Sequence, residues 1–239
     1  MRIPPTRRQR ASAIPFSLAF IVAAGLLGLA AGPAATFGAQ RLLPALDLAA
    51  GRRSHVPAAV FTGALFMVMA WRFGASWLLP ALLFLSAAGV VLSRIDLHFR
   101  LLPNRLVIPA LGTGSALLLL DAAVNERWAN LVVAFIGSAA TFVIYLVLAL
   151  ISPRGLGMGD VKFSAVLALP LGYLSVGQLV LGVSLGFLIG ALVGGVLLLA
   201  GLAGRKSPVP FGPSMFAGCI AAVVFGAELG PALLPSLFT

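Results

Sequence analysis

Two aspartates stand out because each borders an apolar run in a chain that has very few acids. The sequence holds six acidic residues against 16 lysines and arginines. Asp96 follows the apolar stretch 87–92, and Asp160 comes directly before the stretch 161–176. Ionisable groups in a membrane span are functional candidates because burial makes them costly. That cost falls at the edge of a span, so a solvated helix end remains the alternative for each aspartate.

Two carboxylates that converge on one water molecule could hydrolyse a peptide bond. Like charges a few ångströms apart cannot both ionise, so the pair would share one proton near neutral pH. The ionised carboxylate would activate water as a general base. The protonated one would polarise the scissile carbonyl and then protonate the leaving amine. This is the chemistry of an aspartic protease.

The glycines before Asp160 add a second element to this candidate site. Residues 157–160 read Gly-Met-Gly-Asp. Gly157 and Gly159 allow a tight turn and a close approach by another chain. A peptide substrate inside a membrane must be held extended with its backbone paired, and exposed glycine backbone can help to do that. We therefore expect Gly157 and Gly159 to bind substrate or to support the local backbone.

No other set of residues in the sequence competes for catalysis. His55 and His98 lie in no metal-ligand pattern, and neither a Gly-x-Ser-x-Gly nor a His-Glu-x-x-His string occurs. Cys219 is the only cysteine, which excludes an intramolecular disulfide and a cysteine-rich zinc site. The sequence thus predicts neither a metal nor a cofactor for the hydrolytic step.

The composition indicates that membrane helices position these residues. Of 239 residues, 61% are apolar and 9% are charged, whereas soluble domains carry about 25% charged residues. The apolar runs are continuous, which predicts helices and excludes the alternating strands of a barrel. We expect an all-α polytopic membrane bundle of about eight transmembrane helices, forming one domain over 1–239. The predicted spans lie near 15–37, 56–71, 75–92, 106–123, 131–151, 161–176, 178–202 and 208–226.

The basic residues predict which side of the membrane the aspartates face. With eight spans, the loops and span ends on one side hold ten cations: Arg41, Arg52, Arg53, Arg94, Arg100, Arg105, Arg154, Lys162, Arg205 and Lys206. The opposite loops hold Arg72 and Arg127. The first side is therefore predicted to be cytoplasmic. The N-terminal tail breaks the pattern, because eight spans place its arginines on the other side: Arg2, Arg7, Arg8 and Arg10.

The remaining charges need no functional explanation at this level. The net charge of +10 is accounted for by topology and by contact with anionic lipid head groups in the bilayer, so no nucleic-acid partner is expected. Four acids are predicted to lie in solvated loops or at helix ends: Asp47, Asp121, Glu126 and Glu228. Residues 1–39 also have the basic start and apolar run of a signal peptide, and a retained first span is the preferred interpretation.

Three segments together resemble the type IV prepilin peptidase family. Residues 95–104, which read IDLHFRLLPN, resemble its first aspartate block. Residues 157–162 resemble the second block, the Gly-x-Gly-Asp signature shared with presenilin-like intramembrane aspartic proteases. Residues 209–213 resemble a Pro-Phe-Gly-Pro string near the end of the family. The segments occur in the family order over roughly 85–225.

The resemblance implies a catalytic pair, Asp96 and Asp160, at the cytoplasmic face of the bacterial inner membrane. It also implies prepilin-like precursors as substrates, cut between a short basic leader and an apolar helix. Longer members carry a zinc-binding Cys-x-x-Cys insertion after the first span and methylate the new N-terminus with S-adenosylmethionine. About 18 residues separate the first two predicted spans, so the chain resembles a short form without that insertion. S-adenosylmethionine would be needed only if the methyltransferase activity is retained.

Two other functions stay open at this point. In a transporter or channel, Asp96 and Asp160 would be solute or proton ligands on a pathway open to both sides. In a structural subunit descended from a peptidase, neither aspartate would matter. The oligomeric state and the particular pilin substrate are not encoded in these motifs.

Overall fold

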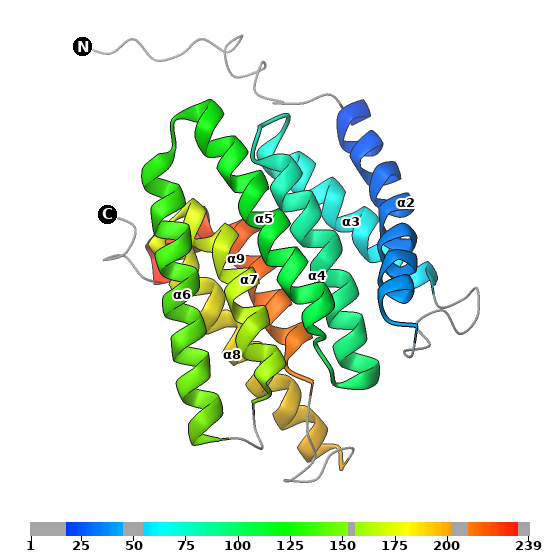
Figure 1. Ribbon diagram of the computed structural model, residues 1–239, viewed down its shortest axis with the longest axis vertical. Coiled ribbons are helices and arrows are strands. Elements are labelled where there is room, and N and C mark those ends of the chain that lie inside the picture. Colours follow the sequence, from blue (N-terminus) through cyan, green and yellow to red (C-terminus); the bar gives the residue numbers. More distant parts are fainter. Residues whose placement is uncertain (1–17, 45–54, 153–155, 202–209, 234–239) are drawn as a thin grey trace.

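A computed structural model describes residues 18–44, 55–152, 156–201 and 210–233, and within these ranges every regular element is an α-helix. The prediction of an all-α bundle of about eight helices is confirmed (Figure 1). The helices are α2 (Leu18–Leu42), α3 (His55–Phe73), α4 (Leu79–Phe99), α5 (Asn104–Asn125), α6 (Trp128–Ile151), α7 (Met158–Leu174), α8 (Val176–Leu199) and α9 (Gly212–Leu233). All except α7 are long and apolar enough to cross a membrane.

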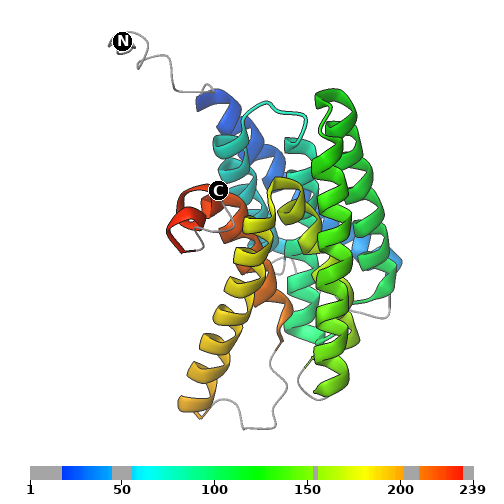
Figure 2. The ribbon, with the colours of Figure 1, turned by 90° about the vertical axis from the view of Figure 1, so that its left-hand side faces the viewer.

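Successive helices run antiparallel, so alternate connections meet at the same end of the bundle (Figures 1 and 2). At the lower end in both views, α2, α4, α6 and α8 finish and α3, α5, α7 and α9 begin. We call this the basic end, because its described cations are Arg41, Arg94, Arg100, Arg105 and Lys162. Arg72 and Arg127 lie at the opposite end, as the spacing of the spans predicts.

Some cations used in the topology prediction lie outside the described residues. They are the four arginines of the N-terminal tail together with Arg52, Arg53, Arg154, Arg205 and Lys206.

The two helices that carry the candidate aspartates are the most enclosed. Nearly every residue of α7 from Val161 to Tyr173 is buried, and two thirds of the most apolar stretch of α4 is buried. A helix that is apolar on all sides belongs in the interior of a bundle. Large apolar side chains on the outer helices are exposed instead, among them Phe61 on α3, Ile136 on α6 and Leu192 on α8. This distribution suits a bundle surrounded by lipid.

Close helix contacts rest on small residues at the interfaces. Gly28 and Gly32 of α2 lie against the backbone of α3 and leave no room for a Cβ atom. Gly218 of α9 lies equally close to Gly186 of α8. Small residues let helix backbones approach closely, which strengthens packing in membranes.

Candidate active site

Asp96 lies in the last turn of α4 and joins that helix to the start of α9. Its side chain is buried, with 5% of its surface exposed. Its Oδ2 atom accepts a hydrogen bond of 2.9 Å from the backbone N–H of Gly212, the first residue of α9. The first N–H groups of a helix have no partner within the helix. The Asp96 carboxylate therefore satisfies one of them and is held in a defined orientation.

Asp160 lies in the first turn of α7 and is held in a similar way. Its Oδ2 atom accepts the backbone N–H of Gly157 at 3.0 Å. Its Oδ1 atom is buried and has no hydrogen-bond partner within the described part of the chain. A buried acceptor gains free energy from any donor that reaches it. Asp160 therefore presents one fixed oxygen and one oxygen that can accept a proton or a hydrogen bond.

The bundle brings the two aspartates together at the basic end. Helices α4 and α7 contact each other, and Asp160 lies within electrostatic range of Asp96. Each carboxylate is at a helix start, Asp160 at that of its own helix and Asp96 at that of α9. The positive end of a helix dipole favours negative charge. Two carboxylates within electrostatic range of each other favour a state with one ionised and one protonated group.

The glycines around Asp160 have different surroundings. A Cβ atom on Gly159 would lie 2.8 Å from Cβ of Leu102, so only glycine allows the start of α7 to pack against the segment between α4 and α5. Gly157 is exposed, and a Cβ atom there would meet Asp160 Oδ2 at 3.5 Å and the Gly159 nitrogen at 3.9 Å, both ordinary contact distances. Gly159 therefore supports the backbone, whereas Gly157 has space in front of it for another chain.

Two neighbours of the aspartates were not predicted from the sequence. Gly212 orients Asp96, and the signal that could have found it is the Pro-Phe-Gly-Pro string. Tyr145 is buried in α6 within electrostatic range of Asp160. It gives no signal in the sequence because it lies inside a long apolar run.

A further polar contact joins the helices around the site. Lys162 Nζ donates a hydrogen bond of 2.9 Å to Asn104 Oδ1, which ties α7 to the first residue of α5. His98 Nδ1 lies 2.9 Å from the carbonyl oxygen of Arg94 in its own helix. Lys162 therefore links two helices at the basic end, whereas the contact of His98 lies within its own helix.

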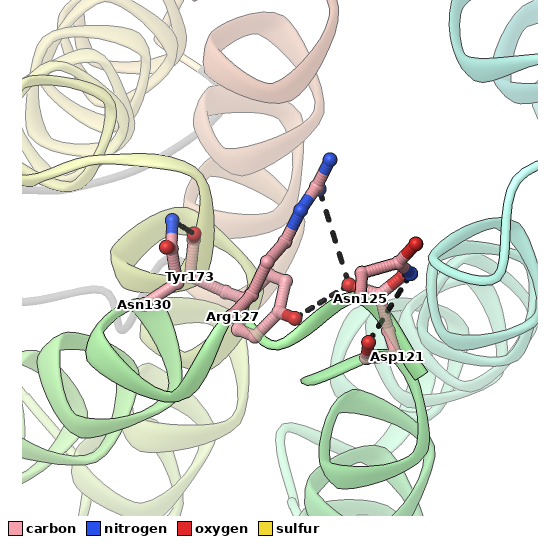
Figure 3. Close-up of polar contacts among 5 residues, drawn as sticks. All are labelled: Asp121, Asn125, Arg127, Asn130 and Tyr173. Atoms are coloured by element: carbon pink, nitrogen blue, oxygen red, sulfur yellow. Dashed lines mark hydrogen bonds and ion pairs between the residues drawn. The ribbon is translucent and has the colours of Figure 1, made fainter. Parts of the chain in front are cut away.

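The prediction that Asp121 is a solvated loop residue is wrong. Helix α5 continues to Asn125, so Asp121 lies within it and only 1% of its surface is exposed. Its Oδ2 accepts the Tyr173 hydroxyl at 2.5 Å, and its Oδ1 accepts Asn125 Nδ2 at 2.8 Å (Figure 3). An apolar span can end in a buried carboxylate when donors surround it.

Of the other three acids that the sequence places in loops or at helix ends, two lie within the described residues. Glu126 is exposed in the turn between α5 and α6, as predicted. Glu228 lies inside α9, which extends beyond the predicted span 208–226; it is exposed and pairs with Arg72 of α3 at 3.1 Å. Asp47 lies outside the described residues.

The contacts of Asp121 form a polar cluster at the end of the bundle opposite to the candidate active site. We define the Asp121 cluster as Asp121, Asn125, Arg127, Asn130 and Tyr173 (Figure 3). Arg127 Nη1 lies 3.9 Å from Asp121 Oδ2, and Asn130 Nδ2 donates to the Tyr173 carbonyl oxygen at 2.9 Å. The cluster joins α5, α6 and α7 and so anchors the far end of the helix that carries Asp160.

We expect Tyr173→Phe to lower the free energy of unfolding in detergent by about 1–3 kcal/mol. The change removes the hydroxyl donor and leaves the buried Asp121 carboxylate short of one hydrogen bond. Arg127→Gln is the control, because a partly exposed pair contributes at most about 1 kcal/mol. Chemical or thermal unfolding checks both. Equal stabilities of Tyr173→Phe and the unchanged protein would contradict a stabilising role for the cluster.

Comparisons with known proteins agree with the motifs that meet at the basic end. A family model described as the type IV leader peptidase family matches residues 82–199. Relatives named prepilin leader peptidase/N-methyltransferase occur in several bacteria. The one from Bacillus subtilis is 36% identical over 175 residues, which cover 72% of this chain and 67% of that protein. The one from Stutzerimonas stutzeri is 31% identical over 70% of this chain and 57% of that protein. The one from Xanthomonas campestris is 30% identical over 64% of this chain and 53% of that protein.

The matches cover only part of the length of each relative. The chain spans about two thirds of the Bacillus protein and a little over half of the other two. No solved structure matches this chain. The family match includes both Asp96 and Asp160, and the relatives are also named as leader peptidases. The chain therefore belongs to the type IV leader peptidase family, a family of peptidases.

Proposed function

We propose that this protein is a membrane-embedded aspartic endopeptidase that removes the basic leader from type IV prepilin-like precursors at the cytoplasmic face. One observation carries the proposal. Asp96 and Asp160 come from two separate family motifs, and they meet at the same end of the bundle within electrostatic range. Each has one oxygen fixed by a glycine N–H.

The geometry supports a shared-proton mechanism. With one proton on the pair, the ionised carboxylate removes a proton from water, and the resulting nucleophile attacks the scissile carbonyl carbon. The protonated carboxyl group polarises the carbonyl oxygen. When the C–N bond breaks, the leaving amine takes a proton from the pair. The N–H groups of Gly212 and Gly157 keep both carboxylates oriented through these steps.

The distribution of cations supports the cytoplasmic orientation. The basic end holds five described cations at helix ends and turns, whereas the opposite end holds Arg72 and Arg127. Positively charged loops remain in the cytoplasm when a bacterial membrane protein inserts. A precursor whose leader stays in the cytoplasm would thus present its cleavage site at the level of Asp96 and Asp160.

The alternative of a transporter or channel has less support. It needs a pathway from the aspartates to the opposite end. Within the described residues, the interior along that direction is filled by fully buried side chains such as Leu92, Val166 and Leu169. Membership of a peptidase family also favours hydrolysis.

The proposal is tested by cleavage with the purified protein in detergent. We expect a prepilin-like precursor to be cut between leader and apolar helix in the presence of a metal chelator and without added S-adenosylmethionine, because two carboxylates and water suffice. Mass spectrometry of both products locates the cut. Loss of cleavage with the chelator and its return with zinc would contradict the aspartic mechanism. A parallel sample with S-adenosylmethionine tests methylation separately, as a gain of one methyl group on the new N-terminus.

A further inference from the structure

An apolar groove lies beside the candidate active site. It has a volume of about 730 Å³ and is formed by the halves of α3, α4 and α9 that are nearer the basic end. Its wall includes Phe61 of α3, Leu97 of α4 and Phe216, Ile220 and Phe225 of α9. A cavity of this size can hold part of a helix or a comparable apolar ligand.

Beyond the groove, toward the end of the bundle opposite to the basic end, Arg72 joins α3 to α9. Arg72 Nε donates to the carbonyl oxygen of Val224 at 3.0 Å, and Arg72 Nη2 lies 3.1 Å from Glu228. Val224 is next to Phe225, the groove residue farthest along α9. These contacts join α3 and α9 just beyond the part of α9 that lines the groove.

The groove and the candidate site share two helices, α4 and α9. Ser93 and Leu97 line it, and they lie three residues before and one residue after Asp96 in α4. Phe216 lies one turn beyond Gly212, whose N–H fixes Asp96. An occupant of the groove would therefore lie against the turns of α4 and α9 that hold the buried Asp96 carboxylate.

The size and lining of the groove match a short length of apolar helix. On α4 the wall extends from Val90 to Phe99, which at 1.5 Å per residue is about 14 Å, or between two and three helical turns. A helix satisfies its own backbone and so can lie in an apolar groove within the membrane. The polar wall residues are Ser93, Arg94 and His98, all of them in the part of α4 toward the basic end.

We infer that this groove binds the first turns of the precursor's apolar helix and thereby delivers the cleavage site to Asp96. The inference rests on the proposed function and adds the surface that recognises the substrate. Most of the lining is apolar, which favours an apolar segment over the basic leader. The apolar segment therefore fills the groove, and the leader stays at the interface, where the two carboxylates lie.

The test fills the groove with a larger side chain. Ala217 is an exposed groove residue of α9, so Ala217→Trp adds bulk to the groove without disturbing the core. Ala140 is exposed on α6, which does not line the groove, so Ala140→Trp is the matched control. We expect Ala217→Trp to raise the KM for a full precursor by about tenfold or more, as overpacking of a binding surface does. Ala140→Trp is expected to leave it unchanged.

A second substrate separates binding in the groove from catalysis. A short peptide that contains the leader and the cleavage site, without the apolar helix, is expected to be cut equally well by Ala217→Trp and by the unchanged protein. If Ala217→Trp cuts the full precursor with unchanged KM, the groove inference is overturned while the proposed function stands. If the unchanged protein cuts neither substrate, the proposed function itself fails.

Photo-crosslinking gives an independent readout of the occupant. A photoreactive amino acid at position 217 is expected to crosslink to the apolar helix of the precursor in an Asp160→Asn background, which traps uncut substrate. The same probe at position 140 is expected to crosslink to lipid alone. Crosslinking to lipid alone from position 217 would overturn the inference.

Discussion

Asp160→Asn is expected to lower the rate of precursor cleavage by about 10²- to 10⁴-fold, the contribution of a positioned acid or base. Asparagine has the same shape and can still accept the Gly157 N–H through its oxygen, so the local backbone is expected to be retained. It cannot take a proton from water or return one to the leaving amine. Single-turnover measurements with purified protein separate this loss from effects on binding.

Asp96→Asn is expected to have the same effect, and the double variant is expected to be no slower than either single variant. Residues that act as one unit show this lack of additivity. Asp121→Asn is the matched control, because Asp121 is a buried carboxylate at the opposite end of the bundle. It is expected to lower stability while leaving the chemical step unchanged. Normal processing of the precursor by either Asp96→Asn or Asp160→Asn would contradict catalysis by the two aspartates.

Gly212→Ala is expected to lower the cleavage rate by about 10²-fold. A Cβ atom on Gly212 would lie 2.8 Å from Oδ2 and 3.3 Å from Cγ of Asp96, so the carboxylate must move. A displacement of about 1 Å in a catalytic group can cost this much. The rate of a single turnover, measured at saturating precursor, reports the effect directly.

The control for Gly212→Ala is the same substitution where space is available. A Cβ atom on Gly112 of α5 would meet nothing within 4 Å. Gly112→Ala is therefore expected to cleave precursor at the normal rate. Equal rates for Gly112→Ala and Gly212→Ala would show that the position of Asp96 does not depend on Gly212.

The helices could be predicted from the sequence because a continuous apolar run of this length can satisfy its backbone hydrogen bonds in a bilayer only as a helix. Helix ends are harder to predict, and Asp121 shows why. A carboxylate at the end of an apolar run gives the same sequence pattern whether water solvates it or a buried tyrosine donates to it. Its partner Tyr173 is 52 residues further along the chain and belongs to another apolar run. Only the packing of α5 against α7 distinguishes the two cases.

In the candidate site, too, residue types and motifs could be predicted from the sequence, whereas contacts between distant segments could not. Asp96 and Asp160 could be predicted because acids are scarce and each lies in a distinctive motif. The role of Gly212 could not, since the contact is a backbone N–H that reaches Asp96 from 116 residues away. The groove beside Asp96 was equally hidden, because three helices contribute to it and none of them is unusual alone.

The most direct test of the central claim is the mass spectrum of a prepilin-like precursor after incubation with purified protein, with the unchanged chain and Asp160→Asn compared side by side. We predict that the unchanged protein releases the leader as one intact peptide and that Asp160→Asn leaves the precursor whole. Release of the leader by both proteins at similar rates would contradict catalysis by the Asp96–Asp160 pair.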